Sequence, residues 1–372
     1  MLFRSSVGVL IAPLLCGYLA QDPSFRGHLA SWGIDPNLCW HFGFGMAAIG
    51  MAAGIIQFII GTKHLGAAGR DPAPPKPLAD RRPIPPIALI VLAVSALIVA
   101  GFAGWRLSDG VDKAAVADAF GVGLAVTGIA VFVIMHQAVA VNADERKRVL
   151  AMAVLFFGCL SFFGIFEQAG STLNLFAEKH TQRQVLGIDF PASYWQSINA
   201  VCVILLAPVF TFLWVFLAKR GKEPFSVNKF AIGMVIAGLA FLALLPTIAM
   251  IDRGEKTSPL YLISYYLMAT AAEMCISPVG LSVMNKLAPE RLQGFVMGVW
   301  FLAISIGLYI AGRASTEVGK LAKHLEWGTG GVFYLTMIFA GIVAALLFAA
   351  AGPVKRMLGE APAELPTAKA KG

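Results

Sequence analysis

The chain has 372 residues, of which 58% are hydrophobic and only 13% are charged. Soluble domains carry about 25% charged residues, so this composition excludes an ordinary soluble domain and indicates a protein surrounded mainly by the lipid bilayer. The formal net charge of +8 does not indicate nucleic-acid binding, because the basic residues lie in short loops and form no stripe with interleaved aromatic residues.

Apolar runs recur along the whole chain, and each is long enough to cross a hydrocarbon core of about 30 Å as a helix. The runs are continuous rather than alternating, which argues against membrane-spanning strands. The sequence therefore predicts an all-α integral membrane protein with about ten transmembrane helices. Their expected ranges are 2–20, 40–62, 86–106, 117–140, 149–176, 193–218, 228–250, 259–285, 292–313 and 330–352.

Ten spans place both ends of the chain on one side of the membrane. Of the Lys and Arg residues, 19 lie on that side and 10 on the other. Cytoplasmic loops carry an excess of basic residues, so the pattern predicts a multi-pass protein with both termini in the cytoplasm. No small-residue cleavage site follows the first apolar run, residues 7–19, which we therefore expect to be a retained span.

The predicted spans differ in polarity. The spans 86–106 and 117–140 have almost no polar residues in their middles, so we expect them to face lipid on most sides. The spans that begin at residues 149, 193, 259 and 292 carry polar or aromatic residues at depth. Polar residues inside a membrane usually face other helices or a water-filled space, so these four spans are predicted to line a cavity.

Two acidic residues, Glu167 and Glu273, lie well inside apolar spans. Glu167 stands at i, i+3, i+4 and i+7 with Gly170, Ser171 and Asn174, which predicts one polar helical face.

The span 259–285 carries a second polar stripe. Tyr266, Thr270, Glu273 and Ser277 recur at i, i+4, i+7 and i+11, and a proline and a glycine at 278 and 280 can kink the helix.

A carboxyl in low-dielectric surroundings holds its proton more readily than in water, and a nearby cation reverses this effect. Its protonation can therefore be coupled to the arrival of a positively charged substrate, as a symporter requires. Two such carboxyls on facing helices predict a combined proton and substrate site. The alternative is that each forms a hydrogen bond to a neighbouring helix and serves only packing.

Amide and aromatic side chains extend this candidate site. Gln196 and Asn199 lie at i and i+3, where they can offer donors and acceptors to a bound peptide unit, although contacts between helices are an alternative role. Trp300 can form the wall of a side-chain pocket, with a core or lipid-facing position as the alternative.

The sequence contains no constellation typical of a metal site or an enzyme. The six histidines do not cluster, and the five cysteines occur singly without a CxxC pair. HExxH, GxSxG and Walker A patterns are absent, so we expect no cofactor, no metal and no enzymatic activity.

Four motifs follow one another in the order typical of a known family. They are FEQAGSTLNLF (166–176), the span from QSIN to APVFTFLW (196–214), EMCISPVGLSVMNKLAP (273–289) and QGFVMGVWFLAISIG (293–307). The chain thereby resembles the proton-dependent oligopeptide transporters of the major facilitator superfamily. The segments 11–21 and 40–51 look like that family's fifth and sixth helices, so the resemblance covers nearly the whole chain.

The resemblance implies a major facilitator-type bundle and roles for individual residues. Glu167 matches the family's proton site, Asn199 its peptide-contacting asparagine, and Glu273 the glutamate that holds the peptide amino terminus. Ser277 and Trp300 match pocket positions. The implied activity is proton-coupled symport of di- and tripeptides across the bacterial inner membrane by alternating access.

The same resemblance implies a division of the chain. Residues 1–62 are expected to be a two-helix remnant of the N-terminal bundle, 63–148 a linker with an inserted helix pair, and 149–356 the C-terminal six-helix bundle. Seven prolines in 63–86 favour a stiff linker, and 357–372 are expected to form a disordered tail.

The family's first four helices, including the ExxER motif, have no counterpart here, so an N-terminally truncated bundle is expected. An alternative function is therefore a non-transporting remnant, or a subunit that needs a separate N-terminal helical segment as its partner. A membrane-embedded enzyme is a third hypothesis, against which the missing nucleophile, base and metal patterns argue.

Overall fold

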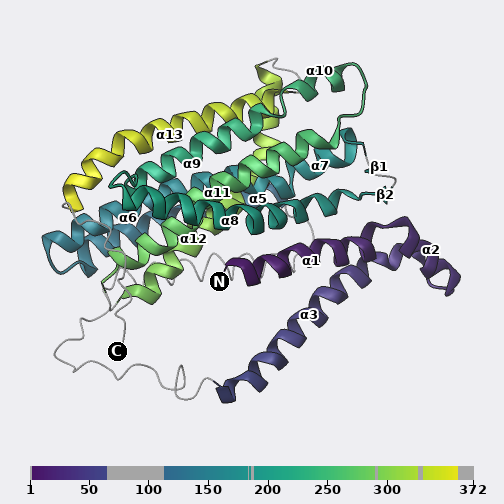
Figure 1. The fold of residues 1–372 in the computed structure, drawn as a ribbon, viewed down its shortest axis with the longest axis horizontal. Helices are drawn as coiled ribbons and strands as arrows, with labels where there is room; N and C mark the ends of the chain where they lie inside the picture. The colour runs from purple at the N-terminus through teal and green to yellow at the C-terminus, as the bar shows by residue number, and fades with distance from the viewer. Residues whose placement is uncertain are drawn as a thin grey trace.

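The computed structural model of the chain describes residues 2–64, 113–182, 184–185, 188–289, 292–325 and 330–358. These residues are almost entirely helical, and the long helices other than α3 run side by side in Figure 1. The long helices are α1 (Leu2–Gln21), α3 (Cys39–Gly61), α5 (Lys113–Ile134), α6 (Ala143–Phe166), α8 (Trp195–Lys219), α9 (Ser226–Leu242), α11 (Pro259–Leu287), α12 (Gln293–His324) and α13 (Gly331–Leu358).

Shorter elements connect them. They are the helices α2 (Pro23–Ser31), α7 (Thr172–His180) and α10 (Pro246–Asp252), a π-helical turn (Met135–Val139), the 3₁₀ turns η1 (Pro36–Leu38), η2 (Thr62–His64), η5 (Glu167–Gly170) and η6 (Ala192–Tyr194), and the antiparallel strands β1 (Gln184–Val185) and β2 (Ile188–Asp189).

The predicted all-α membrane fold is confirmed. Eight helical segments of the described residues are long and apolar enough to cross a membrane, and a shorter apolar helix covers Val7–Gln21. The predicted span 86–106, most of the proline-rich linker and nearly all of the predicted tail lie outside the described residues.

Three predicted spans differ from the structure in their course. The span predicted at 149–176 is interrupted, because α6 ends at Phe166 and η5 separates it from α7. The span predicted at 228–250 divides into α9 and α10, which begins at a proline, a residue that suits the first turn of a helix but not its interior. The helix predicted to end at 313 continues to His324.

The core of the described residues lies where α6, α9, α11, α12 and α13 meet. Phe162 of α6 and Phe230 and Phe241 of α9 are fully buried there. Helices α6 and α12 touch through their backbones, since a Cβ added at Gly307 would lie 2.9 Å from the carbonyl oxygen of Leu160. Close approach of this kind supplies the van der Waals contact that associates helices in lipid.

The N-terminal helices lie along one side of this core. Helix α1 packs between α8 and α3, whereas α3 diverges from the bundle in Figure 1. The Ser197 hydroxyl of α8 donates a 3.0 Å hydrogen bond to the carbonyl of Leu10 in α1. A small separate cluster of Phe25, Leu29 and Cys39 anchors α2 against the start of α3.

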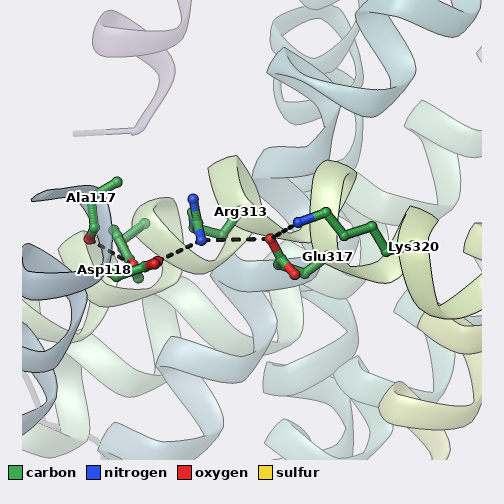
Figure 2. Close-up of polar contacts among 6 residues, drawn as sticks. Ala117, Asp118, Arg313, Glu317 and Lys320 are labelled. Carbon is green, nitrogen blue, oxygen red and sulfur yellow. Dashed lines mark hydrogen bonds and ion pairs between the residues drawn. The ribbon is translucent and has the colours of Figure 1, made fainter. Parts of the chain in front are cut away.

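Helix α5 is attached to α12 by polar contacts at one end. Arg313 pairs with Asp118 of α5 and, at 3.5 Å, with Glu317 of its own helix, which in turn pairs with Lys320 at 3.0 Å (Figure 2). The Tyr309 hydroxyl of α12 donates a 2.8 Å hydrogen bond to the carbonyl of Ala117. Elsewhere in α5 the described residues are exposed or partly buried, except for Gly123, Gly128 and Ile134, which are buried.

Candidate functional site

Glu167 lies at the point where the first site helix breaks. It begins the 3₁₀ turn η5, and the chain departs from helical geometry at Ser171, with φ −119° and ψ −88°. Gly170, Ser171 and Thr172 are all weaker helix formers than alanine or leucine, and three in succession favour a break at this position. The continuous helical face predicted from Glu167 to Asn174 is therefore wrong, although Glu167 itself is half-buried as expected inside the bundle.

The second predicted stripe is confirmed as one helical face. Helix α11 is unbroken from Pro259 to Leu287 and contains Pro278 without interruption. Tyr266 and Thr270 are buried, and Glu273 and Ser277 are partly buried further along the same helix. The Ser277 hydroxyl oxygen is enclosed and has no hydrogen-bond partner among the described residues.

Asn199 of α8 connects directly to this stripe. Its Nδ2 atom lies 2.9 Å from Thr270 Oγ1 and 3.4 Å from Glu273 Oε2. The Thr270 hydroxyl donates a 2.7 Å hydrogen bond to the carbonyl of Tyr266, one turn earlier in α11. The structure thus brings an amide together with a hydroxyl and a carboxyl that each lie more than 70 positions later in the sequence.

The two predicted carboxyls lie near enough for their charges to interact, and the charge of Glu167 also acts on Tyr265. Within the described ranges neither carboxyl has an ion-pair partner. An acidic site without its own cation can accept a proton or a positively charged ligand.

Trp300 lies in the packed core of the described residues. It is 3% exposed, and its ring meets Phe230 edge-on with centroids 6.4 Å apart. A Cβ at Gly280 of α11 would lie 2.2 Å from the Trp300 ring, so glycine provides the space for this indole. Ser277 lies about one helical turn before Gly280. Helix α11 therefore carries the Ser277 hydroxyl one turn away from the glycine against which Trp300 packs.

Gln196 points to a different neighbour from Asn199. It lines a cavity of about 350 Å³ formed by α1, α3 and the start of α8, together with Cys16, Trp40 and Phe44. The structure therefore does not bring Gln196 to Glu273. The predicted pair of amides is divided between two regions, because Gln196 and Asn199 are about 60° apart around α8, which packs against both α1 and α11.

Several buried polar groups were not predicted as site residues. Gln168, next to Glu167, is 3% exposed, and its Oε1 atom has no partner in the described part of the chain. The Tyr265 hydroxyl is likewise enclosed and has no hydrogen-bond partner among the described residues. Hydropathy could not reveal either one, because a single amide or phenol barely changes the mean of an apolar span.

Lys229, in the first turn of α9, is a buried basic residue outside the predicted site. Its side chain is only 8% exposed, pairs with Glu223, and lies 4.5 Å from the centroid of the Trp214 ring. Burial is made tolerable by this carboxylate and by the cation–π contact.

The described residues contain no group of three or more His, Cys, Asp or Glu side chains that could hold a metal ion. Cys16, Cys39, Cys159, Cys202 and Cys275 are all free thiols.

Fold and site together define a helical, multi-span membrane protein whose polar residues converge between helices. The chain belongs to the POT family, whose sequence profile matches residues 1–327. Its bundle is of the major facilitator type, as in the solved structures of that family.

Individual relatives agree with this assignment. The chain is 32% identical to the peptide transporter YePEPT of Yersinia enterocolitica subsp. palearctica, over 95% of this chain and 66% of the relative. It is 29% identical to a di-/tripeptide transporter of Lactococcus lactis subsp. lactis, over 95% and 67% of the two chains. The crystal structure of a peptide transporter POT in complex with sulfate superposes with a TM-score of 0.74 at 29% identity, covering 95% of this chain and 67% of that one. The chain spans about two thirds of the length of these relatives.

Proposed function

We propose that this protein acts in proton-coupled symport of di- and tripeptides across the inner membrane by alternating access. The observation that carries the proposal is the contact of Asn199 with Glu273 and Thr270 between α8 and α11, with a second carboxyl, Glu167, nearby. Relatives named as peptide and di-/tripeptide transporters support the substrate class.

In this proposal the two carboxyls have different tasks. Glu167, at the break after α6, carries the coupled proton. Glu273 and Asn199 bind the amino terminus of the peptide, since a carboxylate and an amide oxygen suit an ammonium group. An arriving ammonium replaces the missing cation, and the proton on Glu167 limits the negative charge of the empty site.

Further residues complete the proposed pocket. Ser277 offers its unpartnered hydroxyl to the substrate, and Trp300 forms an apolar wall behind it. Gln196 is proposed to contact substrate groups that enter between α8 and α1, because it lines the cavity on that side.

Alternating access requires two parts that move against each other around the site. We propose residues 149–356 as one part and residues 1–62 as a contribution to the other, with 63–148 as linker and inserted helix pair. The close packing of α6, α9, α11, α12 and α13 supports a unit that moves as one body. The contact of α1 with α8 forms the interface between the parts in this scheme.

The proposed location is the bacterial inner membrane with both termini in the cytoplasm. The excess of Lys and Arg residues on the face of the two ends supports this orientation.

A second candidate is a subunit, or a non-transporting remnant, whose activity depends on a separate helical segment. The exposure of α3 supports it, because most large apolar residues from Phe44 to Ile60 are uncovered. A partner segment packed on α1 and α3 would cover them, and lipid is the other possible cover.

Proteoliposome transport tests both candidates. With an inward proton gradient, the chain should accumulate a labelled dipeptide, and Glu167→Gln should abolish the gradient-driven part. Glu255→Gln, in an exposed loop where Glu255 pairs with Arg253, is the matched control. Gradient-driven uptake that persists in Glu167→Gln overturns the proton role. Uptake that appears only on co-expression with the first four helices of a relative supports the subunit.

A further inference from the structure

The hydroxyl of Thr270 has a fixed hydrogen-bonding role. Thr270 is fully buried on α11, and its Oγ1 atom lies 2.7 Å from the carbonyl oxygen of Tyr266. A carbonyl oxygen can only accept a hydrogen bond, and a hydroxyl has only one proton. Thr270 therefore donates its proton to the carbonyl oxygen of Tyr266. Towards every other neighbour, Thr270 Oγ1 can therefore act only as an acceptor.

This role determines which way the amide of Asn199 faces. The atom of Asn199 that lies 2.9 Å from Thr270 Oγ1 must carry hydrogen, which identifies it as Nδ2. The same atom is 3.4 Å from Glu273 Oε2, so the second amide hydrogen faces a carboxylate acceptor. Reversing the amide would set its oxygen against two acceptors, which is unfavourable in a buried site.

We infer that Thr270 is a positioning residue, whose hydroxyl orients Asn199 so that its Oδ1 atom remains as an acceptor for a hydrogen-bond donor of the substrate. The inference rests on the proposed function for the identity of that donor, an ammonium or a peptide N–H group. Asn199 Oδ1 and Glu273 then form two acceptors at one place, one neutral and one charged. An ammonium group with three N–H donors can use both.

Neighbouring groups constrain the same amide from other sides. Cys202 lies one turn after Asn199 in α8, and its thiol is close to the Thr270 hydroxyl. The Tyr266 ring is buried on the same face of α11. Glu167, at the start of η5, lies near enough for its charge to act on Glu273. No Lys or Arg in the described residues forms an ion pair with these acids.

Two substitutions at Thr270 separate the hydroxyl from the shape of the side chain. Thr270→Val keeps the branched shape and removes the acceptor, so the amide is free to turn and the site loses its set of acceptors. We expect KM for a dipeptide to rise about tenfold, the effect of one hydrogen bond beside a charged group, with the maximal uptake rate changed less than about threefold. Thr270→Ser keeps the hydroxyl and should stay within about threefold of the unmodified protein.

Thr336→Val is the matched control. Thr336 is 4% exposed on α13 and donates to the carbonyl four residues earlier, at 2.8 Å, as Thr270 does. The structure records no side-chain partner of its hydroxyl in the described residues, so a KM effect common to both valine variants reflects loss of a buried helix hydroxyl and overturns the inference.

Infrared spectroscopy of the purified full chain gives a readout that does not need transport. The carboxylate band of Glu273, identified by its disappearance in Glu273→Gln, should shift in frequency in Thr270→Val and remain in place in Thr270→Ser and Thr336→Val.

The two readouts distinguish the possible failures. An unmodified chain that takes up no peptide, alone or with a co-expressed partner segment, contradicts the proposed function, and the infrared band then decides the inference alone. A band that is unchanged in Thr270→Val overturns the inference whether or not the chain transports. A shifted band with an unchanged KM overturns the role of Thr270 in substrate recognition.

Discussion

Two regions of this protein have similar apolar sequences and different surroundings. Within Ala143–His180, which contains α6, 67% of an apolar stretch of 18 residues is buried. Within Pro36–His64, which contains α3, only 6% of the corresponding stretch is buried. Their mean hydropathies are 2.5 and 1.9, so both qualify as membrane spans. Hydropathy reports that a segment leaves water, but it does not distinguish lipid from protein as the new surrounding, because both are apolar.

The two regions also differ in their polar side chains. Polar side chains converge where helices are surrounded by other helices, at Glu167, Asn199 and Glu273. The exposed stretch of α3 carries no Asp, Glu, Lys or Arg between Trp40 and Gly61. A membrane protein places costly polar groups where partners or water can meet them.

The largest expected effect contrasts a glycine in each region. Gly280→Ala places a Cβ 2.2 Å from the Trp300 ring and 2.7 Å from Phe230, so overpacking should destabilise the core by about 3 kcal/mol. Gly50→Ala in α3 meets nothing within 4 Å and should change stability by less than about 0.5 kcal/mol. Thermal unfolding in detergent measures both, and equal shifts would contradict the difference in packing.

Removing a buried ion-pair partner should have the next largest effect. Glu223→Gln leaves the Lys229 ammonium, whose side chain is 8% exposed, without its carboxylate and should cost about 2 kcal/mol. Asp144→Asn breaks the exposed pair with Lys147 and should cost less than about 0.5 kcal/mol. Unfolding midpoints of the two variants provide the test, and a Glu223→Gln midpoint equal to that of the unmodified protein would show that Lys229 is adequately solvated.

A smaller effect is expected at the attachment of α5 to α12. Arg313→Gln removes contacts with both Asp118 and Glu317, so α5 should detach more readily and stability should fall by about 1 kcal/mol. Lys320→Gln, which removes only the 3.0 Å contact with Glu317, should have an effect near zero. Limited proteolysis next to α5, compared between the two variants, measures the detachment. Identical cleavage rates would indicate that Tyr309 and apolar packing alone hold the helix.

Thiol labelling gives the mildest test and needs no substitution. Cys16 is partly exposed beside the cavity of α1 and α3, whereas Cys159 and Cys275 are buried in the core. A maleimide should therefore label Cys16 in the folded protein and the two core thiols only after denaturation, as mass spectrometry of peptides can show. Early labelling of Cys159 would mean that the core opens more readily than the N-terminal region.

Sequence reasoning predicted the parts of the site that depend on local spacing. The stripe from Tyr266 to Ser277 follows from helical periodicity, and α11 is an unbroken helix as that prediction required. The same reasoning was wrong for the face that begins at Glu167, because periodicity assumes a continuous helix and the chain leaves helical geometry at Ser171. Weak helix formers at 170–172 were the available signal.

Contacts between helices were beyond the reach of the sequence. Gln196 and Asn199 look equivalent in an apolar span, yet one faces α1 and the other faces Thr270 and Glu273. Nothing in the sequence around Lys229 shows that its ammonium lies over the ring of Trp214. The outcome in each case depends on the rotation of one helix against its neighbours.

The sequence by itself determined that the chain is a helical membrane protein with two acidic residues at depth, because hydrophobicity and the cost of buried charge act on each segment separately. Tertiary structure decided which polar groups meet, where α6 ends and how the amide of Asn199 faces. These features arise from close packing and from the matching of hydrogen-bond donors with acceptors across distant segments, and neither has a local signature in the sequence.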